Sequence, residues 1–338
     1  MTCISSDNQN IISKTITNKE KNDRIYFYDS LPLSRTMSAE EHLEQALSEY
    51  NIRISQLENG ENNDELIEAY INRGTVLMMM ESYIAALSDF DEAIDLILEK
   101  ERNNEHVDLG LFIRAYENRG QLYCNNDNEQ MIADYSRIVG KLPLLKTSTR
   151  YFPLKEIVVM CISCAEDLLD ENYPENAVPF LEKTFQMLNG KHDVWAENRF
   201  CEAAGMMGEV KNAIGLKDEA DEYYTRAIMT ASSLLKRNAL EDKYGFVLSL
   251  VDRGDLRESR GDDSGMLSDY MKADEFLEEL IMSGVSDDSE LLVGICQSIA
   301  SKLIDMGKIT DSEKYLLKSM KYGIPEMDDA MDALGLKR

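Results

Sequence analysis

Residues Ala69–Leu98 read AYINRGTVLMMMESYIAALSDFDEAIDLIL, and they place large and small residues at fixed intervals along two helical segments. Tyr70 lies four residues before Gly74, and Ala86, Phe90 and Ala93 follow this glycine at intervals of twelve, sixteen and nineteen residues. Small residues let two antiparallel helices approach closely, while large residues fill the space toward the next pair. The stretch therefore predicts one helix pair that depends on its neighbours for stability.

This spacing resembles the tetratricopeptide repeat, in which large, small and aromatic residues on a first helix precede alanine, aromatic and alanine on a second. The departures are Arg73, where leucine is usual, and Leu98, where proline is usual. The resemblance implies a right-handed superhelix that presents a concave groove to its partners.

The pattern recurs about every 45 residues and covers about four-fifths of the chain. Its small residues are Gly74, Gly120, Ala165, Gly208, Gly254 and Ala300. Second-helix residues recur at the expected offsets as Ala220, Tyr224, Ala227, Tyr270 and Ala273. The copies at Ala165 and Ala300 match less well, and the copy at Gly120 lacks one residue, which we place in its turn. Because the usual repeat has 34 residues, we expect longer helices here.

We therefore predict an all-α fold: a right-handed α-solenoid, or TPR-like superhelix, of antiparallel helix pairs with about fourteen helices. One elongated domain is expected at 38–338, after a flexible leader at 1–37. Its expected parts are a capping helix at 38–58, repeats at 64–101, 105–141, 154–188, 193–236, 240–284 and 287–322, and a C-terminal cap at 325–335. In the leader, Ile25–Tyr28 is interpreted as packing on the first helices, with a linear motif or groove plug as the alternative.

The composition restricts the classes of partner. The chain has 338 residues, 63 acidic against 36 basic, and a net charge of -27. Such a charge repels phosphates and anionic membranes, so we expect neither nucleic acid nor membrane as a partner. The N-terminus has no basic start followed by an apolar core, and the chain has no apolar run near 20 residues, so a cytoplasmic location is expected.

Motifs for catalysis are weak, and we expect neither an enzyme nor a bound cofactor. Cys161 and Cys164 form the only CxxC, which redox or zinc chemistry could use, but it falls inside a predicted helix and favours core packing. Asp328, Asp329 and Asp332 spell DDxxD, yet they fall on the expected cap without a second acidic motif. Three histidines leave few groups that titrate near neutral pH.

The resemblance also implies which residues face the groove, because the family's inward positions lie six and three before the small residue and one, four and five after it. Of the thirty residues at these positions, nine are acidic and one is basic. We select fifteen as candidate partner-binding residues: Glu68, Ile71, Met78, Met79, Arg114, Glu117, Gln121, Asn125, Glu166, Asp170, Glu202, Glu209, Asn212, Asp255 and Glu258. A carboxylate-rich groove favours a segment that carries lysine or arginine.

The favoured interpretation is a non-catalytic protein-interaction scaffold. An acidic surface with binding elsewhere remains an alternative, as do a peptide-responsive regulatory module and a metal-dependent helical enzyme. A chaperone-tail adaptor is disfavoured, because Ile71 and Val159 occupy the positions of the family's clamp lysines and only Asn118 fits. The partner's identity and the oligomeric state stay open.

Overall fold

The computed structural model describes residues 38–58, 63–146 and 153–323. These residues form thirteen α-helices and one 3-10 helix. The helices are α3 (Ala39–Leu57), α4 (Asn63–Met79), α5 (Tyr83–Arg102), α6 (Leu109–Tyr123), α7 (Asn128–Lys141), η1 (Leu142–Leu144), α8 (Leu154–Asp170), α9 (Pro174–Leu188), α10 (Val194–Ala213), α11 (Lys217–Lys236), α12 (Lys243–Glu258), α13 (Asp263–Met282), α14 (Ser289–Asp305) and α15 (Ile309–Gly323). The prediction of an all-α solenoid is confirmed. The leader with Ile25–Tyr28, the C-terminal cap and the DDxxD motif lie outside the described residues.

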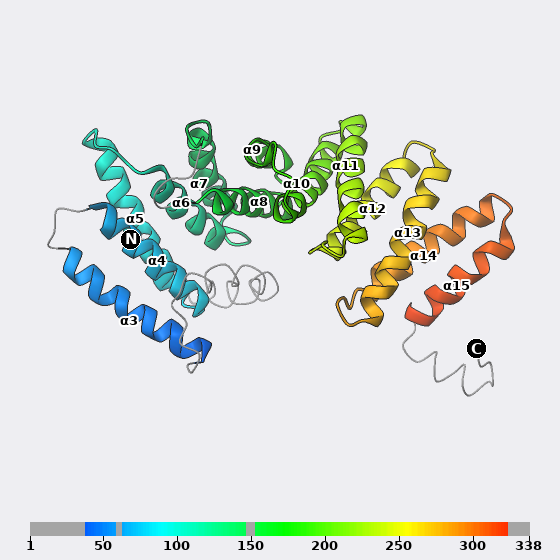
Figure 1. Cartoon of the computed structure of the whole chain (residues 1–338), viewed down its shortest axis with the longest axis horizontal. Helices are drawn as coiled ribbons and strands as arrows, with labels where there is room; N and C mark the ends of the chain where they lie inside the picture. The colour runs from blue at the N-terminus through cyan, green and yellow to red at the C-terminus, as the bar shows by residue number, and fades with distance from the viewer. Residues whose placement is uncertain (1–37, 59–62, 147–152, 324–338) are drawn as a thin grey trace. The chain divides into compact units, whose positions relative to one another are not determined.

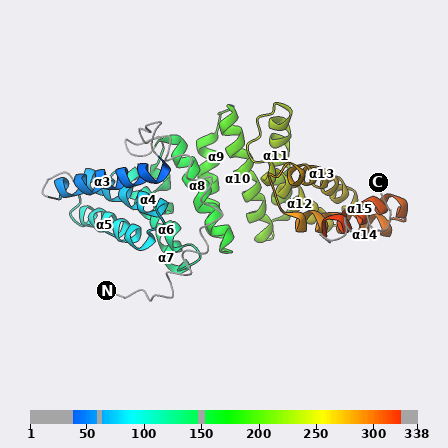
Figure 2. The same ribbon diagram turned by 90° about the horizontal axis from the view of Figure 1, so that it is seen from below.

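After the single helix α3, the described helices form six pairs, each with a first and a second helix. In five of the pairs, α4–α5, α6–α7, α10–α11, α12–α13 and α14–α15, the two helices pack together. The second helices α5, α11 and α13 also contact the first helix of the next pair. Figures 1 and 2 show this succession in chain order. The sequence leads us to expect one elongated domain, whereas contacts group the chain into two compact units, Met1–Lys183 and Thr184–Arg338. The division falls inside α9, in which Pro179 removes one backbone donor.

Local sequence signals explain where many helices begin. Ser38 and Glu41 form a reciprocal capping box at the start of α3. Aspartates at the N-caps of six later helices each accept hydrogen bonds from backbone amides of the first turn, which lack partners within the helix. These aspartates are Asp108, Asp127, Asp193, Asp242, Asp262 and Asp288.

Every turn inside a pair contains one residue with a left-handed backbone conformation. Five of these residues stand seven positions after the small residue of their copy: Glu81, Asn172, Gly215, Gly261 and Gly307. In the second pair the residue is Asn125, only five positions after Gly120. This regularity fixes where each first helix ends and its partner begins.

The prediction that the second copy lacks a residue in its turn was wrong about the place. Helix α6 ends at Tyr123, three residues after Gly120, whereas α4, α8, α10 and α14 continue for five residues after their small residue. Four residues then separate α6 from α7. Cys124 leaves the helical region with ψ 133°, and the side-chain amide of Asn126 donates to the carbonyls of Leu122 and Cys124. The loss is therefore in the helix.

The small residues pack against the second helix of their own pair. A Cβ added to Gly208 would lie 2.6 Å from Cδ1 of Tyr224, and the distance from Gly254 to Cε1 of Tyr270 would be 2.4 Å. Such distances leave no room for a methyl group. The two copies with alanine, Ala165 and Ala300, carry leucine instead of an aromatic ring at the facing position sixteen residues later. Glycine therefore accompanies a ring and alanine accompanies leucine, which explains why these two copies resemble the family pattern less.

Candidate functional site

The residues expected to bind a partner lie on or just after the first helices, and in the first pair three of them are part of the packing. Ile71 on α4 is fully buried, so it is removed from the set of accessible residues. Met78 and Met79 are half-buried and pack against different core clusters, Met78 near Phe90 and Met79 near Val76. The first pair therefore offers less exposed apolar surface than the sequence suggested.

Two candidate residues on α6 connect neighbouring first helices. Arg114 Nη2 donates to Oδ1 of Asn72 on α4 at 2.7 Å. On the same helix, Gln121 Nε2 donates to Oγ of Ser163 on α8 at 3.0 Å and to Oε1 of Glu117 at 2.9 Å. These residues are half-buried. Arg114 and Gln121 therefore form polar contacts between consecutive pairs.

The other candidates of Met1–Lys183 differ in their surroundings. Glu68 lies 4.0 Å from Nη2 of Arg53 on α3, which makes it part of an exposed ion pair. Asn125 lies in the turn after α6 rather than on a helix. Glu166 is half-buried near the end of α8, and Asp170 is its exposed last residue. Opposite charge beside Glu68 makes it a weaker anchor for a basic partner.

In the unit Thr184–Arg338, the candidates come from α10 and α12. Glu202 is neutralised by Arg199, whose Nη1 lies 3.0 Å from its Oε2. Glu258 lies 3.6 Å from the ammonium of Lys302 on α14, and Asn212 is exposed near the end of α10. These residues are accessible, but the two carboxylates already have a cationic neighbour.

Three acids, Glu209 on α10 and Asp252 and Asp255 on α12, form what we call the α10–α12 carboxylate cluster. Burial, together with the charges of Glu209 and Asp255, raises the pKa of Asp252 to about 7. No hydrogen bond or ion pair links Asp252 to another residue of the described ranges. The hydroxyl of Tyr270 donates to Oδ1 of Asp255, and burial still raises the pKa of Asp255. At neutral pH this face holds crowded negative charge.

Sequence reasoning missed Asp252 because it stands two residues before Gly254, a position outside the set of inward offsets. The equivalent position is polar in five of the six copies: Asn72, Asn118, Ser163, Asp252 and Ser298. Two of these residues, Asn72 and Ser163, bind Arg114 and Gln121, as described above. This recurrence of a polar residue two positions before the small residue was the signal that could have identified Asp252.

The CxxC pair lies in the core of α8. Cys161 and Cys164 have no exposed surface, and burial raises the pKa of the Cys164 thiol well above its usual value. A neutral, buried thiol is a poor nucleophile and a poor metal ligand. Within residues 38–58, 63–146 and 153–323, no group of three or more histidine, cysteine and acidic side chains is arranged to hold a metal ion. In the same part of the chain, no helix is long and apolar enough to cross a membrane.

No family model matches the sequence, and no curated protein matches it. The fold is similar to two solved structures. The first is PH0952 from Pyrococcus horikoshii, a signal transduction ATPase with numerous domains that has a tetratricopeptide repeat sensor; the TM-score is 0.53 at 12% identity, over 88% of this chain and 44% of that one. The second is BtubC (BKLC) from P. vanneervenii, with a TM-score of 0.50 at 13% identity, over 72% of this chain and 93% of that one. By fold, the chain is a tetratricopeptide-type repeat protein of six described helix pairs.

Proposed function

We propose that the protein is a non-catalytic interaction scaffold, and that the first-helix face of Thr184–Arg338 binds a partner segment carrying lysine or arginine. The α10–α12 carboxylate cluster carries this proposal. Its acids repel one another, and Asp252 has no cation among its described neighbours. An incoming ammonium or guanidinium group would relieve that repulsion and form charge-assisted hydrogen bonds.

The same chemistry makes the proposed binding depend on pH. Asp252 has a pKa of about 7, so near neutral pH a substantial fraction of this carboxyl is protonated. A basic partner favours the ionised form, because opposite charge lowers the pKa of an acid. Affinity is therefore expected to rise between pH 6 and pH 8, in contrast to a surface whose acids are fully ionised throughout this range.

The test compares the wild type with two triple variants of equal charge. In the cluster variant, Glu209→Gln, Asp252→Asn and Asp255→Asn remove the three acids of the site. In the control variant, Glu222→Gln, Glu275→Gln and Glu279→Gln remove three exposed acids of the second helices α11 and α13. Each protein is immobilised and used to capture partners from the native lysate at low and moderate salt.

A Lys/Arg-bearing partner should be retained by the wild type and the control variant and lost by the cluster variant. Its retention should weaken as the salt concentration rises, since exposed charges are screened. Retention of the same partners by all three proteins would refute binding at the cluster and point to another surface. Circular dichroism of the three proteins shows whether each is folded.

A peptide-responsive regulatory module is the second candidate, and the placement of Arg114 and Gln121 favours it. Both residues are candidate partner-binding residues, and both link neighbouring pairs through Asn72 and Ser163. A ligand that competes for these side chains would weaken the contacts between pairs and change their spacing. X-ray scattering of the protein with and without its captured partner distinguishes the two candidates, because only the regulatory module requires a change in the radius of gyration.

A further inference from the structure

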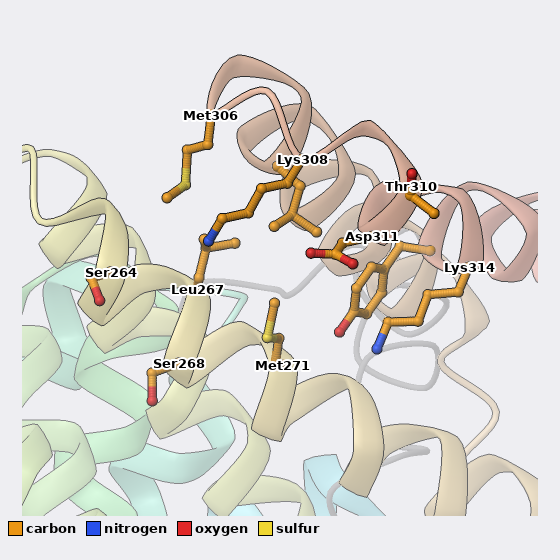
Figure 3. Close-up of a pocket in the computed structure, with 11 residues that line it drawn as sticks. Ser264, Leu267, Ser268, Met271, Met306, Lys308, Thr310, Asp311 and Lys314 are labelled. Carbon is orange, nitrogen blue, oxygen red and sulfur yellow. The ribbon is translucent and has the colours of Figure 1, made fainter.

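A pocket of about 570 Å³ lies between the second helices α13 and α15, outside the first-helix face described above. Leu267 and Met271 from α13 and Leu303 from α14 provide apolar walls. In Figure 3, Leu267 and Met271 face Met306 and Lys308 across the opening. The pocket is therefore an apolar recess with a cationic rim, on a chain whose net charge is -27.

The equivalent junction one repeat earlier is bridged by charge. Arg260 binds Asp218 at 2.8 Å and Arg257 lies 3.4 Å from Asp221, which joins the end of α12 to α11. Counted from the small residues, Met306 and Ser264 replace Arg260 and Asp218.

By the same count, Leu303 and Leu267 replace Arg257 and Asp221. Both ion pairs of the preceding junction are thus replaced here by apolar or hydroxyl side chains. The substitutions leave an open recess where the preceding repeat has a bridged surface.

The rim holds cations that the protein does not neutralise within its described part. Lys308 and Lys314 are exposed, and neither forms an ion pair with a described residue. In contrast, Lys302 on α14 lies 2.9 Å from Asp263, and Lys318 on α15 lies 2.9 Å from Asp274. In a chain with so many acids, two such lysines beside one apolar recess provide a local attraction for carboxylates.

Tyr315 provides a hydrogen-bond donor at the edge of the recess. Its side chain is only 4% exposed, it lines the pocket, and its hydroxyl makes no hydrogen bond with a described residue. Lys314 lies over its ring, with Nζ 4.5 Å from the centroid. The hydroxyl has no partner among the described residues, so a carboxylate placed between Lys314 and Tyr315 could accept a hydrogen bond from it.

We propose that this pocket binds a partner peptide segment in which a bulky apolar residue is flanked by aspartate or glutamate. The apolar side chain enters between Leu267, Met271 and Met306, and the flanking carboxylates bind Lys308, Lys314 and the hydroxyl of Tyr315. Asp311 on the same rim repels acidic groups, but the two lysines outweigh this single carboxylate, so the site favours acidic partners. This site is separate from the α10–α12 carboxylate cluster and has the opposite charge preference.

The test uses the full chain and a fluorescein-labelled peptide, Gly-Glu-Asp-Leu-Asp-Glu-Gly, with binding followed by fluorescence anisotropy. A second peptide with serine in place of leucine measures the apolar contribution. Charge reversal is more informative than salt here, because salt screens the local attraction and also the long-range repulsion of a chain with net charge -27.

Lys308→Glu with Lys314→Glu should weaken binding of the leucine peptide by about tenfold or more, since two charge-assisted contacts become repulsive. The control, Lys191→Glu with Lys236→Glu, makes the same change in charge at exposed positions outside the pocket and should leave affinity within about twofold. Tyr315→Phe keeps the ring and should weaken binding about fivefold by removing one hydrogen bond. The serine peptide should also bind at least about tenfold more weakly, because leucine burial contributes to affinity.

Equal affinity in the pocket variant and the control would overturn the proposal. If the wild type does not bind, the Asp328→Lys, Asp329→Lys variant decides between two further results. Binding that appears only in this variant would identify the chain's own acidic, methionine-containing C-terminal stretch as the occupant and rule out an external partner. Absence of binding in both proteins would rule out the site.

Discussion

Arg73 and Asp89 form a bidentate ion pair between the two helices of the first pair, with Nε to Oδ2 at 2.7 Å and Nη2 to Oδ1 at 2.6 Å. Identical pairs recur twice, as Arg119 with Asp134 and Arg253 with Asp269. The arginine always directly precedes the small residue, and the aspartate directly precedes the aromatic residue. The apparent departure from the family pattern at Arg73 is thus half of a buried pair.

The three remaining copies replace both partners together. Where arginine is absent, the preceding residues are Cys164, Met207 and Ile299, and the facing positions hold aromatic rings instead of aspartate. These rings belong to Phe180, Tyr223 and Tyr315. The internal repeats therefore contain two alternative ways to join a pair, one ionic and one apolar.

The first prediction concerns replacement of the ion pair between Arg73 and Asp89 by an apolar residue and an aromatic ring. Arg73→Met should lower the free energy of unfolding by about 3 kcal/mol, because the carboxylate of Asp89, only 3% exposed, loses its cation. Adding Asp89→Tyr should recover most of that loss and bring the protein within about 1 kcal/mol of the wild type, since apolar pairs often replace buried ion pairs at little cost. Urea unfolding of both single variants and the double variant measures the coupling, and purely additive effects would contradict the exchange.

The second prediction concerns the contact between Gly208 and Tyr224. Gly208→Ala should destabilise the protein by about 2 kcal/mol, because the new methyl group would overlap the tyrosine ring. Tyr224→Leu in the same chain should relieve this overlap, as the natural combinations Ala165 with Leu181 and Ala300 with Leu316 indicate. Thermal unfolding of the single and double variants provides the measurement, and an alanine variant as stable as the wild type would exclude the close contact.

Asp252 provides a prediction about pH. Its pKa is raised from 3.8 to about 7, so the folded state binds this proton more tightly than the unfolded chain does. The contribution to stability is therefore fully present below pH 4 and is lost as the pH rises to about 7. Asp252→Asn should stabilise the protein at pH 8 by about 1–2 kcal/mol, a value reduced for solvent screening, and should have little effect at pH 4.

Urea unfolding at pH 4, 6 and 8 tests this expectation. Glu222→Gln serves as the control, because Glu222 is an exposed acid on α11 and its removal changes the net charge equally. A pH profile for Asp252→Asn that runs parallel to that of the wild type would mean that Asp252 is not the group responsible.

Glu81 provides the fourth prediction. Its φ of 58° lies in the left-handed region, where the backbone of residues other than glycine and asparagine is strained. Equivalent turns use Asn172, Gly215, Gly261 and Gly307. Glu81→Gly should therefore raise the free energy of unfolding by about 0.5–1 kcal/mol. The change is measured by chemical denaturation, and the exposed neighbour Ser82→Gly, which lacks a positive φ, should not be stabilising.

The helix pairs could be predicted because their signals are local and repeated. The intervals between Gly74 and Ala300 placed each of the six described pairs within a few residues, because a one-residue shift would move the small residues away from the facing helix. The missing residue of the second copy could not be located in the same way. The sequence shows only that Gly120 and Tyr135 are one residue closer along the chain than Gly74 and Phe90. The end of α6, in contrast, depends on the backbone conformation of Cys124.

The candidate surface was less predictable, because accessibility depends on how neighbouring helices pack. Ile71 occupies an inward position of the family pattern, yet it is completely buried here. Arg114, the one basic residue at the inward positions, binds Asn72 on the preceding first helix. The polarity of each residue could be read from the sequence, whereas its contacts across 40 or more residues required the structure.

The polar contacts between consecutive pairs join residues about one repeat apart, as in Arg114 with Asn72, Gln121 with Ser163, Tyr244 with Asp288, and Lys318 with Asp274. Contacts of such short reach give the chain a particular response to mechanical load. Under tension applied at its ends, a terminal pair can detach without first disturbing pairs further along, because nothing in these links ties it to them. The protein should then lengthen in successive small steps, each of which unfolds one repeat, and the repeats should refold one at a time when the force falls.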